Sequence, residues 1–395
     1  MSGILEGIRV LDFGRYIAGP FCATLLADLG ADVIRIEKPS GGEDRFTVPV
    51  TDDGQGAYYQ QLGRNKRGIT LNPMKPEGRE IVRRLVATAD VVVVNLPVTA
   101  LVKMGLDYDS LCAIKPDIIL STASAFGSTG PYAPKGGFDT IAQAMSGGMY
   151  LSGEGEKPAK SFAPYCDFGT GSLSAFGTLA AIIHKMKTGE GQAVDGSLLS
   201  TALTFNNAAL IEQAMIKANR SGSGTRGQYN APTDSFQTVD GWVTVQIVGH
   251  GLFKRWVALV GDDARWLNDE RFSSDQNRGD NGAIIAERMQ EWITGKTNIE
   301  VLTALSQAGI PAGELLTPAQ VLENEHVVQG KFFQHVNIDG ADIAAPIADH
   351  PMNYSKSPVR EFKAAPKLGQ HTAEIMLELG FDQNEIDTLY ESATI

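Results

Sequence analysis

One carboxylate, Asp167, has a sequence environment that could support chemistry. It follows the apolar stretch 162–166 and precedes a run rich in glycine, serine and alanine that extends to residue 181. Glycine costs a helix about 1 kcal/mol relative to alanine, so a helix that retains several glycines is expected to let another backbone approach closely. The sequence therefore places Asp167 where an apolar segment turns into a closely packed helix. That position suits either an N-cap residue or a nucleophilic or acid–base carboxylate in a dry site.

Two other kinds of side chain could take part in chemistry. Cys166 lies beside Asp167 and has no evident histidine or asparagine partner, so a buried packing role is favoured over a nucleophilic one. Basic side chains near strand ends could bind phosphate groups. The candidates are Arg35, Lys38, Arg64, Lys66, Arg67 and Lys103. For any single lysine among them, a solvated surface position is the simpler interpretation.

The elements that must position these residues alternate along the chain. The predicted strands are 8–13, 32–37, 91–94 and 117–121, and the predicted helices are 21–29 and a segment that begins at residue 76. The four valines at 91–94 are typical of a parallel strand buried on both faces. We therefore expect an α/β fold, doubly wound up to about residue 200, with ligands at the carboxyl ends of its strands. No G-x-G-x-x-G pattern follows the first strand, as a dinucleotide fold would require.

The pattern changes in the middle of the chain. A G-x-G-x-x-G sequence at 222–227 follows a helical segment, 197–218, and not a strand, so a flexible linker is favoured over a phosphate cradle. Alternating apolar residues from Asp234 and the short helices that follow predict a smaller α+β domain. The predicted organisation is a large α/β domain at 1–200, a linker at 201–230, a small α+β domain at 231–325, and a return linker with the C-terminal part of the large domain at 326–395.

Composition narrows the class of protein. The chain has 34 lysines and arginines against 46 aspartates and glutamates, a net charge of −12, which argues against general binding to nucleic acid or to an anionic membrane. Charged residues interrupt the N-terminal segment, so no signal peptide is expected. The weakly polar run 168–183 is too short and too rich in glycine and serine to span a bilayer. Three cysteines without metal-like spacing and scattered histidines favour a reduced, cytoplasmic protein without a metal site.

Six sequence blocks carry a more specific signal than any residue alone. They are Ala18–Pro20, Leu26–Ile34, Asn65–Arg67, Phe126–Tyr132, Ile310–Gly313 and Leu368–Thr372. In their order and spread over nearly the whole chain, they resemble the family III CoA-transferases, the carnitine and formyl-CoA transferase type.

This resemblance implies an assembly and a site. Members are interlocked homodimers, with a Rossmann-like large domain built from both chain ends and a small middle domain. The active site lies between the large domain of one subunit and the small domain of the other. The family's catalytic aspartate falls on Asp167. Its coenzyme A contacts fall on Arg15, Tyr16, Ala18, Lys38, Leu71, Asn95, Leu96, Lys103 and Met104.

The resemblance also implies an activity. Coenzyme A would move from an acyl-CoA thioester, such as succinyl-CoA or a related dicarboxylyl-CoA, to a carboxylic acid through a covalent intermediate on Asp167, with no permanently bound cofactor. An aspartyl anhydride or thioester suits a nearly balanced exchange, whereas an oxygen ester on serine would be too stable. Backbone N–H groups at 169–171 are expected to stabilise the oxyanion. Ile17 replaces a glutamine of formyl-CoA transferase, and 248–251 lacks its tetraglycine loop, so oxalate is not the expected acceptor.

Three other functions remain to be weighed. A 2-methylacyl-CoA racemase has the same fold, but its Gly-His-Asp block reads Gly137-Phe138-Asp139 here, and phenylalanine cannot accept a proton. A nicotinamide dehydrogenase is disfavoured because the G-x-G-x-x-G fingerprint is missing after Phe13. Binding of NAD(H) to the protein would support this alternative. A catalytically silent binding protein is distinguished by a CoA-transfer assay.

Overall fold

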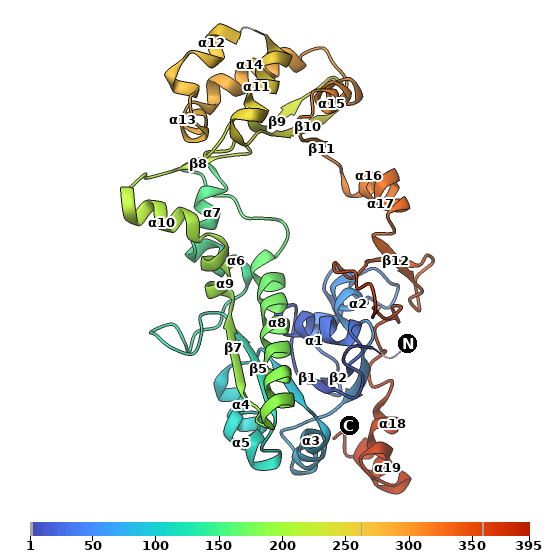
Figure 1. The fold of residues 1–395 in the computed structure, drawn as a ribbon. Coiled ribbons are helices and arrows are strands. Elements are labelled where there is room, and N and C mark those ends of the chain that lie inside the picture. The colour runs from blue at the N-terminus through green and yellow to red at the C-terminus, as the bar shows by residue number, and fades with distance from the viewer. Residues whose placement is uncertain (1–2, 262, 358) are drawn as a thin grey trace. The chain divides into compact units, whose positions relative to one another are not determined.

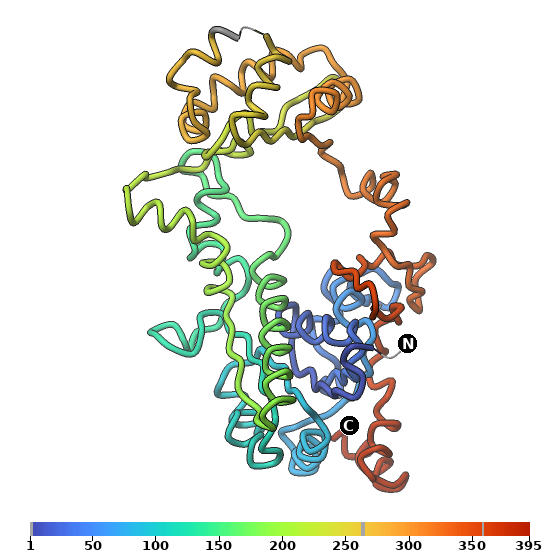
Figure 2. The backbone as a smooth tube through the Cα atoms, in the orientation of Figure 1, coloured from blue at the N-terminus to red at the C-terminus, as the bar shows by residue number. Residues whose placement is uncertain are grey.

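A computed structural model describes residues 3–261, 263–357 and 359–395 (Figure 1). The chain divides into two compact units that each draw on separate stretches of sequence, as the backbone trace shows (Figure 2). The first unit comprises Met1–Ser146, Phe162–Ile211 and Gly330–Ile395, and the second comprises Gly147–Ser161 and Glu212–Gln329. This division departs from the predicted boundaries in one main respect. Residues 147–161, which the sequence pattern assigned to the large domain, belong to the second unit.

The first unit is built on a six-stranded sheet in the order β3-β2-β1-β4-β5-β7, and every neighbouring pair is parallel. Its strands are β1 (Arg9–Asp12), β2 (Asp32–Glu37), β3 (Arg67–Thr70), β4 (Val91–Val94), β5 (Ile119–Ser124) and β7 (Ala193–Ser197). The prediction of an α/β fold with a parallel sheet is confirmed. The strand order reverses between β1 and β4, the point at which sheets of this kind bind ligands.

Helices cover both faces of this sheet because both faces are apolar. Val10, Val33 and Val91 face a cluster that includes Leu26 of α1 and Ile182 of α8. Residues of alternate register, including Leu11, Ile34 and Val92, pack against α3, α5, α18 and α19. The helices of this unit are α1 (Ala18–Asp28), η1 (Glu43–Phe46), α2 (Ala57–Gly63), α3 (Pro76–Thr88), α4 (Val98–Met104), α5 (Tyr108–Ile114), α6 (Asp139–Met145), α8 (Tyr165–Thr188), α9 (Leu198–Phe205), α18 (Thr372–Glu378) and α19 (Gln383–Glu391), and a hairpin joins β12 (Phe333–Val336) to β13 (Ala345–Ala348).

The second unit has an antiparallel sheet and its own core. The sheet order is β11-β10-β9, and buried Trp256 and Trp266 lie in the cluster beneath it. Its elements are α7 (Gly148–Leu151), β6 (Glu154–Gly155), β8 (Gly222–Ser223), β9 (Thr233–Gln237), β10 (Trp242–Gln246), α11 (Gly249–Val260), α12 (Asp263–Leu267), η2 (Glu270–Phe272), α13 (Asp275–Asp280), α14 (Gly282–Ile293), α15 (Asn298–Gln307), β11 (Ala312–Glu314), α16 (Pro318–Glu323) and α17 (Glu325–Gln329).

The boundary between the two units lies between Ile211 and Glu212, inside the linker predicted at 201–230. The helical segment expected at 197–218 is present as α9 and the helix α10 (Asn207–Ile216), and β8 follows it. The glycine-rich segment 222–227 lies inside the second unit, where β8 pairs with β6 and the Gly224 N–H donates to the Gly153 carbonyl oxygen at 2.7 Å.

Helix α8 is long and apolar enough to cross a membrane by length and composition. It packs instead inside the first unit, where Ala175, Ala181 and Ile182 are buried in the cluster formed with α1 and the sheet. The helix is therefore a core element of this unit.

Candidate active site

Asp167 occupies the third position of α8, which begins at Tyr165 after the N-cap residue Pro164. Its side chain is half-buried and makes no cap hydrogen bond. Among the residues that the structure describes, nothing donates a hydrogen bond or forms an ion pair with this carboxylate. The N-cap alternative is therefore wrong, and Asp167 is available for chemistry.

The glycines after Asp167 allow the close packing that the sequence predicts. A Cβ atom on Gly171 would lie 2.8 Å from the Ala18 carbonyl oxygen, and one on Gly169 would lie 2.6 Å from the ring of Phe205. Phe168 packs edge-on against Phe21 with ring centroids 4.9 Å apart. The first two turns of α8 are thus held between α1 and α9.

A second carboxylate, Asp139, lies beside Asp167. One of its oxygens, Oδ1, accepts hydrogen bonds from the backbone N–H groups of Cys166 and Asp167, at 2.7 and 3.1 Å. Its other oxygen accepts from the Gln143 side chain at 2.5 Å. Burial, and in second place the charge of Asp139, raise the pKa of Asp167 to about 7. Asp167 therefore titrates in the neutral range, where a general base or nucleophile is most useful.

The predicted oxyanion donors are not free. Gly169, Thr170 and Gly171 lie in the second turn of α8, where each N–H is directed to the carbonyl four residues earlier. The donors of the first turn are also occupied, because Asp139 takes two of them and Phe168 donates to the Pro164 carbonyl oxygen at 3.1 Å. The expectation that 169–171 stabilise an oxyanion is wrong.

Cys166 fits the packing role that the sequence favours. It is fully buried, and burial, together with the nearby Asp139 charge, raises the pKa of its thiol to about 12. A thiol with that pKa is almost entirely protonated at neutral pH and is a poor nucleophile.

The residues predicted to contact coenzyme A lie at the carboxyl edge of the sheet. Arg15, Tyr16 and Ala18 follow β1, Lys38 follows β2, Leu71 follows β3, Asn95 and Leu96 follow β4, and Lys103 and Met104 lie in α4. The structure joins two of these loops directly. The Arg15 N–H donates to the Asn95 side-chain oxygen at 2.7 Å, and the Asn95 amide donates to the Arg15 carbonyl oxygen at 2.8 Å.

These candidates differ in what they could offer a ligand. Leu71 is fully buried in the core, so only its backbone could contact one. Lys38 is exposed and pairs with Glu43 at 2.6 Å. Lys103 is exposed and has no ion-pair partner within the described part of the chain. Tyr16 has a left-handed backbone, with φ of 57°, which is uncommon for a non-glycine residue and clusters at functional sites.

The predicted phosphate-binding role of the other basic residues is wrong, because carboxylates already occupy them. Lys66 is buried and pairs with Asp12 at 2.8 Å, and Arg64 pairs with Asp28 at 2.7 Å. Arg35 pairs with Asp44 at 2.5 Å, and Arg67 with Asp32, Glu374 and Glu378. These are structural ion pairs of the fold.

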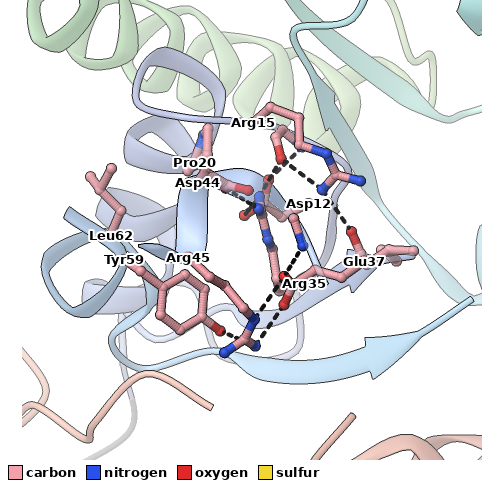
Figure 3. A network of polar contacts seen from close by, with 12 residues as sticks. Asp12, Arg15, Pro20, Arg35, Glu37, Asp44, Arg45, Tyr59 and Leu62 are labelled. Atoms are coloured by element: carbon pink, nitrogen blue, oxygen red, sulfur yellow. Dashed lines mark hydrogen bonds and ion pairs between the residues drawn. The ribbon is translucent and has the colours of Figure 1, made fainter. Parts of the chain in front are cut away.

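The buried pairs hold the β1–α1 loop from below (Figure 3). Arg35 donates to the Gly14 carbonyl oxygen, and Asp12 accepts from the Gly14 N–H at 2.8 Å. Glu37 continues the network through two hydrogen bonds with Arg45, at 2.9 and 2.7 Å. The loop that carries Arg15 and Tyr16 is therefore held in place by buried ion pairs and hydrogen bonds.

Comparison with known proteins identifies the family of this chain. The family described as CoA-transferase family III matches residues 5–372. The chain is 34% identical over 388 residues to succinate–glutarate CoA-transferase of Agrobacterium fabrum, covering 95% of each protein. It is 33% identical over 394 residues to succinyl-CoA:mesaconate CoA-transferase of Haloarcula marismortui, covering 96% of this chain and 97% of that protein.

Solved structures show the same fold. A CAIB/BAIF family protein from Brucella suis superposes with a TM-score of 0.82 at 32% identity, over 96% of this chain and 100% of that chain. Rv3272 from Mycobacterium tuberculosis superposes with a TM-score of 0.82 at 25% identity, over 94% of this chain and 99% of that chain. The protein is therefore a member of CoA-transferase family III.

Proposed function

We propose that this enzyme transfers coenzyme A from succinyl-CoA, or a related dicarboxylyl-CoA, to a carboxylic acid, with Asp167 as the covalent nucleophile. The observation that carries this proposal is the state of Asp167. It is a half-buried carboxylate without a hydrogen-bond partner in the described chain, and its pKa is raised to about 7. Relatives named for succinyl-CoA and for glutarate or mesaconate support the choice of donor.

The proposed steps balance without any other reactant. An Asp167 oxygen attacks the donor thioester carbon, and the CoA thiolate leaves to give a mixed anhydride. The thiolate then attacks the aspartyl carbonyl, which releases the donor acid and leaves CoA on Asp167 as a thioester. The acceptor carboxylate attacks this thioester, and the thiolate returns to the acceptor carbonyl of the new anhydride. Asp167 is regenerated, and the acyl-CoA product leaves.

The start of α1 replaces 169–171 as the proposed source of oxyanion donors. The Phe21 N–H makes the first hydrogen bond of this helix, to the Ile17 carbonyl oxygen at 2.7 Å. The preceding N–H groups of Ala18 and Gly19 have no partner within the described residues. Ala18 also lies against the second turn of α8. An oxyanion formed at Asp167 could accept from these groups.

The CoA thioester is proposed to bind across the carboxyl edge of the sheet, on the nine residues from Arg15 to Met104 named above. We describe the first unit as Rossmann-like on the basis of its strand order. Two loops that the resemblance implicates meet at its switch point through Arg15 and Asn95.

Lys103→Ala tests this binding site. Loss of a free, exposed cation should raise the KM for the acyl-CoA about 5- to 10-fold and leave kcat within about twofold. Steady-state kinetics with saturating acceptor measure both constants. Lys363→Ala is the matched control, because Lys363 is exposed and its carbonyl accepts from the Asn65 N–H, just before β3 begins and away from the carboxyl edge of the sheet. An equal change in both variants, or none in either, contradicts the assignment.

We propose that the enzyme is an interlocked homodimer. Large apolar side chains are exposed along one stripe of α8, at Leu173, Phe176, Ile183 and Met186, and Phe176 is 72% exposed. Their spacings of three, seven and three residues put them on one helix face. Such a stripe indicates a protein interface, and a second copy is the partner that the family resemblance implies.

The proposal needs no permanently bound cofactor, since coenzyme A is part of both substrates. A cytoplasmic location is also proposed. Cys22, Cys112 and Cys166 are all free thiols in the structure, which suits a reducing compartment.

Mass spectrometry of the trapped intermediate tests the function. Succinyl-CoA without acceptor should leave a CoA thioester on the peptide that contains Asp167, and the true acceptor acid should remove it. An adduct on Cys166 would contradict the nucleophile assignment, and transfer without isotope exchange between donor and free acid would contradict the covalent mechanism.

The same enzyme incubated with a 2-methylacyl-CoA in heavy water separates the racemase alternative. Phe138 stands where the racemase needs a proton-transferring histidine and is 62% exposed. The α-position should remain undeuterated, whereas deuterium uptake at a catalytic rate would support racemisation.

A further inference from the structure

A buried carboxylate next to the nucleophile has no part in the steps above. Asp139 is 6% exposed and is the first residue of α6. We propose that Asp139 is a positioning residue for Asp167, whose carboxylate anchors the first turn of α8 and whose negative charge keeps Asp167 a strong nucleophile. This inference rests on the proposed function of Asp167.

The anchoring role follows from the hydrogen bonds. The first N–H groups of a helix have no partner inside it, and Pro164 supplies no side-chain cap for α8. Oδ1 of Asp139 takes two of these groups, those of Cys166 and Asp167. Because one of them belongs to Asp167 itself, Asp139 fixes the backbone from which the nucleophile projects. The bond from Gln143 to Oδ2 fixes Asp139 in turn.

The charge role follows from the position of Asp139 at a helix N-terminus. The partial positive charge of that end would otherwise stabilise the Asp167 anion and weaken it as a nucleophile. Asp139 neutralises this end and adds a like charge close to Asp167. Both effects disfavour the resting carboxylate and are relieved when Asp167 becomes a neutral anhydride or thioester, so they assist the acylation step.

The other elements around Asp167 do not supply an opposing charge. On its own helix the neighbouring titratable groups are Tyr165 and Cys166, and the pKa of each is raised by burial. Asp139 is the only titratable residue of α6, and α9 has none.

The remaining neighbours are also accounted for. The titratable residues of α1 are Cys22, whose pKa is raised to about 12 by burial, and Asp28, which pairs with Arg64. From the sheet, β7 contributes Asp195, which accepts from Thr122. In the β1–α1 loop, Tyr16 packs on Phe138 at 5.5 Å, and the Arg15 side chain donates to the Gly14 and Ile36 carbonyl oxygens.

Asp139→Asn separates the two roles, because the amide oxygen can still accept both N–H groups while the charge is lost. A carboxylate nucleophile must be ionised, so the rate rises with pH through the pKa of Asp167. In Asp139→Asn the midpoint of this rise should move to lower pH by about one unit, and the alkaline plateau should fall about 3- to 10-fold. An unchanged midpoint and plateau would overturn the charge role.

Asp139→Glu covers the case in which the asparagine variant does not fold. It keeps the charge and displaces the anchor, so the midpoint should stay near that of the wild type while kcat falls about 10- to 100-fold. Wild-type kcat in Asp139→Glu would overturn the positioning role.

A measurement without turnover keeps this inference distinct from the proposed function. An aspartate with a raised pKa costs the folded state stability once pH exceeds its unfolded value, and the cost is complete above its folded pKa. The Tm of Asp167→Asn should therefore rise relative to that of the wild type as pH rises from 4 to 8.5. The same substitution should give a smaller rise in Tm when it is made in Asp139→Asn. Equal gains would overturn the inference even if CoA transfer is confirmed. A smaller gain would support it even if the enzyme proved to catalyse another reaction.

Discussion

Asp167→Asn should lose CoA-transfer activity by about 10³-fold or more, because an amide side chain cannot form the anhydride or the thioester. The loss should appear in kcat for every donor and acceptor pair, since each passes through the same residue. Binding of the acyl-CoA should persist, because the proposed contacts lie on the loops after β1, β2, β3 and β4 and on α4. Transfer assays and equilibrium binding of CoA measure the two quantities separately.

Stability distinguishes this loss from misfolding. Because the pKa of Asp167 is raised to about 7, the ionised group costs the native state about 1.4 kcal/mol for each unit of difference from the unfolded chain. The asparagine variant should therefore be at least as stable as the wild type above pH 7. Asp387→Asn, at an exposed position of α19, is the activity control. Substantial turnover in Asp167→Asn would remove Asp167 from the mechanism.

Asp12→Asn should have the largest effect on stability. Asp12 is fully buried with Lys66 at 2.8 Å and Arg35 at 3.7 Å, and its cations hold the pKa of Asp12 below the ordinary value against the opposing effect of burial. Asparagine could still accept from the Gly14 N–H, but buried Lys66 would lose its counter-charge, whereas Arg35 would keep its ion pair with Asp44. Removing one partner of a buried pair costs about 3–5 kcal/mol.

Denaturant unfolding of Asp12→Asn and of a control variant measures this cost. Glu80→Gln is the control, because Glu80 makes comparably short contacts to Arg83 and Arg84 on the surface of α3. Exposed pairs contribute about 0–1 kcal/mol, so the control should remain close to the wild type. Similar free energies of unfolding for Asp12→Asn and the wild type would show that the network is dispensable.

The parts of this fold that depend on local pattern could be predicted from the sequence. The strand 32–37 and the valine strand 91–94 match β2 and β4, and Pro76 opens α3 as predicted. Strands β3 and β7 were missed because arginine, glycine and aspartate interrupt them. They lie at the two edges of the sheet, where pairing with a neighbouring strand, and not the local pattern, determines whether a strand forms.

Contacts between distant residues could not be predicted in the same way. Asp139 and Asp167 are 28 residues apart, and a carboxylate at the start of one helix gives no sign that it will bind the start of another. Lys66 and Arg64 looked like a ligand-binding cluster because their partners, Asp12 and Asp28, come from segments far upstream. Tertiary packing alone decides whether a basic residue pairs with a carboxylate of the fold or remains available to a ligand.

The paired hydrogen bonds between Arg15 and Asn95 bear on the thermodynamics of ligand binding. They tie the loop after β1 to the loop after β4 in both directions, so neither loop can move relative to the other without breaking the contact. A binding surface that is already ordered loses little conformational entropy when its ligand binds. Coenzyme A should therefore meet a preorganised surface at the centre of the sheet, and the free energy of its contacts is available for holding the thioester against the nucleophile.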